Sequence, residues 1–142
     1  MKDLLVMKFG GTSVGSAERI QAACRILSEE SRRRPVVAVI SAMAKVTDLL
    51  LDTLRRAEAG EEYYVRTSLG KLRERHLTAC RQLLPEAERA PVEQAIEQIV
   101  GEFQRIATGI LMLGERPPGS VDEAVAVGER LSVLLVSACL NS

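Results

Sequence analysis

The sequence predicts an α/β fold in which two parallel strands are followed by a helix-rich remainder. Residues 4–7 and 36–40 are short, continuously apolar runs, which is typical of strands covered on both faces of a sheet. Apolar residues at helical spacing lie between the two runs, so this region forms a parallel strand–helix–strand unit. From residue 61 to residue 113 the apolar spacing is helical. The sheet is therefore expected near the beginning of the chain.

The composition excludes several classes of function. The 142 residues carry 19 basic and 19 acidic side chains, and this balance gives no support for binding nucleic acid or a membrane surface. Only 3% of the residues are aromatic, which disfavours a base-stacking platform. No apolar run is long enough to span a bilayer, so a cytoplasmic location is expected. Cys24, Cys80 and Cys139 are expected to be small buried residues of a reducing compartment.

A glycine-rich polar turn, KFGGTSVG at residues 8–15, follows the first strand. Ligands bind outside the carboxyl ends of strands in open α/β sheets, where Lys8 would supply a positive charge. Gly10 and Gly11 allow close approach of an anion to the backbone, and Ser16 is a plausible N-cap of the next helix. Neither the Walker A pattern nor the GxGxxG spacing is present. The turn is interpreted as a phosphate-binding turn, and a purely structural strand-to-helix turn is the alternative.

A second polar turn follows the second strand, with the sequence SAMAKVTD at residues 41–48. The carboxyl ends of neighbouring parallel strands meet at one edge of the sheet, so the two turns should share one crevice. Ser41 and Thr47 are taken from the residues alone as turn or capping hydroxyls. Gly60 is expected to end the helix that follows.

Residues 61–114 are expected to form a helical hairpin that is interrupted at Pro85 and Pro91. An oligomer contact could explain the same apolar seam. His76 lies in a charged run and is expected on an exposed helical face. Residues 120–123, SVDE, predict a capping box for a further helix that Gly128 interrupts, with Glu129 as a surface charge at the next helix start.

Three of these segments resemble motifs of aspartokinases, within the amino-acid kinase superfamily. KFGGTSVG resembles their opening motif, and it stands at the N-terminus as in that family. Ser41-Ala42-Met43 followed by Val46-Thr47-Asp48 looks like the second motif, although these enzymes commonly have glycine where this chain has Ala44. The Gly128-Glu129 pair is similar to a third motif and follows in the right order. The departure at Ala44 leaves Lys45 without an assigned role.

The resemblance implies a role for each matching residue. Lys8 would be catalytic, neutralising charge on the transferring phosphoryl group. The residues implied to bind ATP are Lys8, Phe9, Gly10, Gly11 and Ser41. The residues implied to bind L-aspartate are Thr12, Ser13, Thr47 and Glu129. Mg²⁺ would bridge the phosphates, and no residue of this chain is assigned as its ligand.

The resemblance also implies a fold and an activity. Residues 1–142 would be the N-terminal half of an amino-acid-kinase-like three-layer domain, without the nucleotide-base half and the regulatory ACT domains. The reaction would be phosphoryl transfer from ATP to the side-chain carboxylate of L-aspartate, giving aspartyl 4-phosphate, the first step of lysine, threonine and methionine biosynthesis. The isolated chain is expected to be incomplete and inactive, and the full enzyme to be a homo-oligomer.

Several alternatives stay open at the level of sequence. The helical segment and the region of Leu113 and Gly114 also resemble enzymes in which the kinase is fused to homoserine dehydrogenase, and both fused and unfused forms fit. A sister amino-acid kinase could act on a different acid. A non-catalytic helical association module with a vestigial phosphate turn is the alternative from another class.

Overall fold

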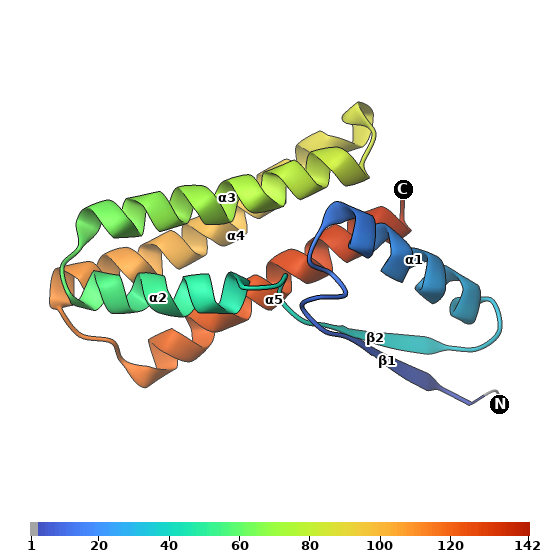
Figure 1. The fold of residues 1–142 in the computed structure, drawn as a ribbon, viewed down its shortest axis with the longest axis horizontal. Coiled ribbons are helices and arrows are strands. Elements are labelled where there is room, and N and C mark those ends of the chain that lie inside the picture. The colour runs from blue at the N-terminus through green and yellow to red at the C-terminus, as the bar shows by residue number, and fades with distance from the viewer. Residues whose placement is uncertain (1–2) are drawn as a thin grey trace.

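The computed structural model describes residues 3–142 and confirms the predicted α/β class, with two parallel strands and five helices (Figure 1). The elements follow one another along the chain as β1 (Leu5–Phe9), α1 (Ala17–Ser31), β2 (Val36–Ile40), α2 (Val46–Glu58), α3 (Glu62–Leu83), α4 (Glu86–Leu113) and α5 (Pro118–Leu140). No helix among the described residues is long and apolar enough to cross a membrane.

The two strands pair in parallel, with Leu5 opposite Val36 and Phe9 opposite Ile40. One face of this sheet contributes Phe9 and Ile40 to the core. Side chains alternate between the faces of a strand, and the opposite face remains open. Its valines are exposed, Val6 to 60%, Val37 to 48% and Val39 to 47%. The expectation that both faces are covered is therefore wrong for this chain, because helix packing hides only one of them.

The helices α2, α3, α4 and α5 pack against one another, and α1 joins them through α5 and α3. Figure 1 shows α3 and α4 running antiparallel as a hairpin, with α2 and α5 beside them. The apolar seam expected from the sequence faces this interior. Its fully buried members include Leu72, Ile96 and Phe103.

Two expectations about the hairpin are wrong. His76 is fully buried, and its Nδ1 lies 2.8 Å from the Leu72 carbonyl oxygen. It follows Leu72 by four residues and therefore shares the buried face of α3, in spite of the charged residues around it. Pro91 does not interrupt α4 but lies inside it. Proline removes one backbone donor, which is tolerated here near the exposed beginning of the helix.

The last helix also differs from the prediction. α5 begins at Pro118, whose fixed φ suits the first helical position, so SVDE at residues 120–123 lies within the helix and forms no capping box. Gly128 does not interrupt α5, and Glu129 lies in the middle of the helix instead of at a start. The reason for a glycine at this position lies in its packing, described below.

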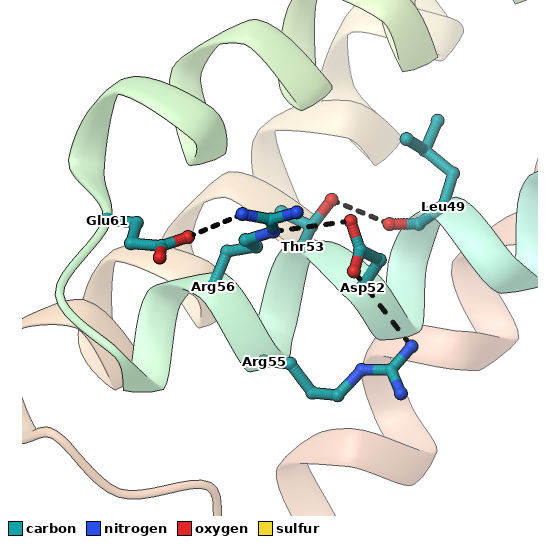
Figure 2. Close-up of polar contacts among 6 residues, drawn as sticks. All are labelled: Leu49, Asp52, Thr53, Arg55, Arg56 and Glu61. Carbon is teal, nitrogen blue, oxygen red and sulfur yellow. Dashed lines mark hydrogen bonds and ion pairs between the residues drawn. The ribbon is translucent and has the colours of Figure 1, made fainter.

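The turn between α2 and α3 is held by charged side chains at the end of the molecule away from the sheet (Figures 1 and 2). Arg56 Nη1 lies 2.9 Å from Glu61 Oε2, and its Nε lies 3.7 Å from Asp52 Oδ2. Gly60 has a φ of 80° and ends α2 as expected. Because these ion pairs are largely exposed, each contributes little to stability. The cluster orients the turn and is separate from the glycine-rich loop.

Candidate functional site

The three polar segments predicted from the sequence meet around Ala42. A Cβ atom placed on Gly11 would lie 2.9 Å from the Ala42 carbonyl oxygen. On the other side, a Cβ atom on Gly128 would lie 2.9 Å from Ala42 Cβ. Ala42 is therefore enclosed between the first loop and α5 at distances that leave no room for a further carbon. We call this arrangement of Gly11, Ala42 and Gly128 the loop junction.

The first loop leaves β1 with Lys8 exposed and Phe9 buried. Phe9 anchors the loop in the core, so only its backbone can contact a ligand. Gly10 has open space where a side chain would be, and Thr12 and Ser13 are exposed. The turn is closed by the Ser13 amide, which donates to the Gly10 carbonyl oxygen at 3.0 Å. Exposed hydroxyls beside an open glycine backbone are suited to binding an anion.

Two amides of this loop have no acceptor within the described part of the chain. The Gly11 and Thr12 N–H groups donate to no protein atom among the backbone and side-chain hydrogen bonds of residues 3–142. α1 follows the loop directly, and Ser16 caps it by accepting from the Arg19 amide at 3.2 Å, as predicted. Unpartnered amides and a helix N-terminus both favour negative charge.

The second loop continues the pairing of the sheet and then crosses to the first loop. The Ser41 amide donates to the Phe9 carbonyl oxygen at 3.0 Å, and the Ala44 amide donates to the Gly11 carbonyl oxygen at 3.0 Å. Ser41 is half-buried, whereas Thr47 is exposed in the first turn of α2. Thr47 follows Val46, which itself contacts the loop junction beside Gly128. The structure therefore brings this loop against both other segments.

Lys45 has the only positive φ of a non-glycine residue among residues 3–142, at 69°. It occupies the N-cap position of α2, and its side chain makes no capping hydrogen bond. The left-handed region is unfavourable for residues with a Cβ atom. Backbone strain in the second loop is therefore located at Lys45, the residue that follows Ala44, where the sequence departs from the family pattern.

Glu129 is exposed on α5 and borders an open groove with a volume of ≈ 710 Å³. The groove is mostly apolar and is also lined by Val39 of β2. Val39 is paired with Lys8, and the two residues share the open face of the sheet. Val39 therefore adjoins Lys8 in the sheet and lines the groove together with Glu129.

Arg75 of α3 contacts both loops, although no sequence pattern singled it out. Its Nη1 donates to the Ala44 carbonyl oxygen at 2.5 Å, and its Nη2 donates to the Gly15 carbonyl oxygen at 3.2 Å. Burial lowers the pKa of its guanidinium. Arg75 lies in a run of charged residues at positions 71–76, where nothing in the spacing distinguishes it from its neighbours.

Residues 3–142 contain no group of three or more His, Cys, Asp or Glu side chains placed to hold a metal ion. The loops around the junction instead offer amides, hydroxyls and a lysine. This donor set suits phosphate oxygens and does not suit Mg²⁺, which prefers carboxylate and water oxygens. We therefore assign no metal ligand to this chain. The thiols of Cys24, Cys80 and Cys139 are free, and the first two are buried as predicted.

Comparison with known proteins identifies the family of this chain. A model of the amino acid kinase family matches residues 3–142. Aspartokinase 3, chloroplastic, of Arabidopsis thaliana is 34% identical over 138 residues, which are 96% of this chain and 23% of the relative. The bifunctional aspartokinase/homoserine dehydrogenase, chloroplastic, of Daucus carota is 33% identical over 132 residues, 93% of this chain and 14% of the relative.

The fold is shared with a solved enzyme. The crystal structure of E. coli aspartokinase III in complex with aspartate and ADP matches with a TM-score of 0.82 and 25% identity, covering 98% of this chain and 29% of that one. This chain spans less than a third of each of these three proteins. The predicted resemblance to aspartokinases is confirmed. Its fold, its sequence and the matching family model agree, and the chain belongs to the amino acid kinase family.

Proposed function

We propose that this chain is the N-terminal part of an aspartate kinase, which transfers the γ-phosphoryl group of ATP to the side-chain carboxylate of L-aspartate and forms aspartyl 4-phosphate. The observation that carries the proposal is the loop junction, where Gly11, Ala42 and Gly128 bring the three predicted motifs together. The relatives are named as aspartokinases, and one is named in complex with aspartate and ADP. The reaction would be the first step of lysine, threonine and methionine biosynthesis.

The two loops would hold the nucleotide phosphates. The proposed ATP-binding residues are Lys8, Phe9 through its backbone, Gly10, Gly11 and Ser41. The unpartnered Gly11 amide supports this assignment, because a buried or partly buried N–H group gains from an anionic acceptor. Lys8 would neutralise charge on the transferring phosphoryl group, where electrostatic stabilisation contributes most.

The aspartate would lie on the far side of the transferring group from the nucleotide. Its proposed ligands are Thr12, Ser13, Thr47 and Glu129, all of which are exposed in the structure. Glu129 can accept hydrogen bonds from an amino group, and the hydroxyls of the other three can donate to carboxylate oxygens. This combination of one acid with several hydroxyl donors suits an amino acid with an additional carboxylate.

The chemistry needs no general base, because a carboxylate is already a nucleophile. The main obstacle is that two anions must approach each other, so positioning and charge neutralisation supply the catalysis. Mg²⁺ would enter with the nucleotide phosphates, and no step of the proposal depends on a metal ligand from this chain. We expect this chain alone to be inactive, because it spans less than a third of the aspartokinases that it matches.

Isothermal titration tests the proposal. Mg-ATP is titrated into the chain with and without L-aspartate, then into Lys8→Ala and into Lys71→Ala as a matched lysine control on exposed α3 surface. We expect Lys8→Ala to weaken binding at least about tenfold, because a charge-assisted contact is lost. Equal affinities of the two variants would contradict the assignment of Lys8. L-glutamate in place of L-aspartate tests the alternative that another acid is the substrate.

The open face of the sheet favours one further candidate function, self-association. Val6, Val37 and Val39 form an exposed apolar surface on adjoining strands, and β1 and β2 both have an unpaired edge. We propose that the full enzyme is a homo-oligomer, and that this chain associates through the sheet. A strictly monomeric chain at high concentration in sedimentation equilibrium would contradict the second statement. A cytoplasmic location stays a prediction, since several of the relatives are named chloroplastic.

A further inference from the structure

Arg75 makes a contact pattern that differs from that of its neighbours on α3. Arg73 and Arg81 form exposed ion pairs with Glu97 and Glu93 of α4. No ion pair among residues 3–142 involves Arg75. Its guanidinium turns instead to two backbone carbonyl oxygens in two different loops. The side chain is partly buried, so the charge has left bulk water without a carboxylate partner.

The two carbonyl groups belong to the two loops of the proposed phosphate site. Gly15 ends the first loop, and Ala44 lies in the second. Beyond the ends of the strands, the backbone of the two loops is linked by the hydrogen bond from the Ala44 amide to the Gly11 carbonyl oxygen. Together with the Ser41–Phe9 hydrogen bond at the strand ends, it leaves the far part of the first loop, at Gly15, without a backbone link to the second, and Arg75 supplies that contact. Arginine suits this role because its donors are held in a rigid, planar fork.

We propose that Arg75 is a positioning residue that holds the two loops at the separation needed to bind phosphate oxygens. The role in phosphate binding rests on the proposed function, whereas the contacts of Arg75 with the two loops do not depend on it. Arg75 donates to carbonyl oxygens of these loops, whereas the Gly11 and Thr12 amides donate to no atom of residues 3–142 and are available for an anion. Its positive charge also lies in contact with both loops and adds to the attraction of a phosphate.

The first test uses the wild-type chain and needs no variant that must fold. Two hydrogen bonds to fixed carbonyl groups should stop the guanidinium of Arg75 from rotating about its Nε–Cζ bond. Its Nη protons should then give separate NMR signals, unlike those of the exposed Arg66. A single averaged signal for Arg75 would overturn the proposal.

The second test compares hydrogen exchange in Arg75→Gln, Arg75→Lys and the control Arg73→Gln. We expect the Ala44 and Gly15 amides to exchange about tenfold faster in Arg75→Gln, as for the loss of one good hydrogen bond. Arg75→Lys should be intermediate, because an ammonium group reaches one carbonyl more readily than two. Millimolar guanidinium ion should restore slow exchange in Arg75→Gln alone. Equal exchange in Arg75→Gln and Arg73→Gln would overturn the proposal.

The third measurement is titration of the same proteins with Mg-ADP. Arg75→Gln should bind at least about fivefold more weakly than Arg73→Gln, because the loops are no longer held together. Equal affinities would show that Arg75 has no part in phosphate binding. If wild type binds no nucleotide, the proposed function fails, whereas the NMR and exchange results still decide whether Arg75 fixes the loops.

Discussion

The helical hairpin of α3 and α4 and the loop junction are packed in opposite ways. In the hairpin, large side chains such as Leu72, Ile96 and Phe103 fill the space between helices. At the loop junction, Gly11 and Gly128 lie directly against Ala42. This close approach is possible only because the two glycines have no side chain. A hairpin core accepts many apolar combinations of similar volume, whereas a junction of this kind accepts only the smallest residues. The hairpin should therefore lose stability when a side chain is made smaller, and the loop junction when a side chain is made larger.

The largest effect on stability is expected from removing a large side chain from the hairpin core. Phe103→Ala removes a ring that is 1% exposed and should lower the free energy of unfolding by about 3–5 kcal/mol. Urea denaturation measures the change. Phe103→Leu is the control and should cost much less, because most of the volume is kept. A loss below about 1 kcal/mol for Phe103→Ala would mean that the hairpin core is not packed as described.

The loop junction should respond to the addition of a single carbon. Gly128→Ala places a Cβ atom 2.9 Å from Ala42 Cβ and 3.2 Å from both Leu50 Cδ1 and Val46 Cγ1, and should cost about 1–3 kcal/mol. Gly109→Ala in α4 is the matched control, since no atom lies within 4 Å of its added carbon.

The control substitution should change the stability in the opposite direction. Gly109→Ala is expected to stabilise the chain by about 0.5–1 kcal/mol, because alanine is the better helix former. Thermal and urea denaturation of both variants check this difference. Stabilisation by both substitutions would show that Gly128 is not closely packed against Ala42.

His76 should make stability depend on pH. Burial lowers the pKa of its imidazole, and its Nε2 has no partner among the described residues. At neutral pH the group is uncharged in both states. As the pH falls below the unfolded value of about 6.5, only the unfolded chain gains the proton, so stability falls by up to about 1.4 kcal/mol per pH unit.

Urea denaturation at pH 7.5 and pH 5.5 measures this dependence, with His76→Gln as the comparison. The variant should lose most of the slope between these two pH values, since ordinary carboxylates titrate at lower pH. A slope that persists in His76→Gln would assign the effect to other groups.

The smallest effect belongs to Lys45. Its φ of 69° costs about 1–2 kcal/mol for a residue with a Cβ atom. Lys45→Gly removes this strain but adds flexibility to the unfolded chain, which leaves a net gain of about 0.5–1 kcal/mol. Lys71→Gly within α3 should instead destabilise the chain by about 1 kcal/mol. Melting temperatures that fall equally in both variants would argue against strain at Lys45.

The hairpin was the more predictable of the two regions. Apolar residues repeat every three or four positions along α3 and α4, so the buried faces follow from periodicity, and the same rule applied to His76 would have placed it inside. The strands and the Ser16 cap were also predictable from local signals. The continuous course of α5 was not predictable from local signals. Glycine is unfavourable within a helix, and the close packing that explains Gly128 is seen only in the structure.

The site was predictable only in part. The glycine-rich turn and the second polar turn follow strands, and parallel pairing brings them to one edge. The contact of Gly128 with Ala42 and the two hydrogen bonds of Arg75 join residues that are distant in sequence. No local pattern carries that information. The roles of Lys8, Thr47 and Glu129 stay predictions.

An amide NMR titration of this chain with Mg-ADP tests most directly whether the three segments form one ligand site. If the three segments form one ligand site, the signals of Gly10, Gly11, Ser41 and Gly128 should shift together, with one common affinity. Lys8→Ala should weaken that affinity. The charged turn around Arg56 serves as an internal reference and should not shift. Shifts that are absent from the loop junction, or that appear mainly around Arg56, would show that the three segments do not form one ligand site.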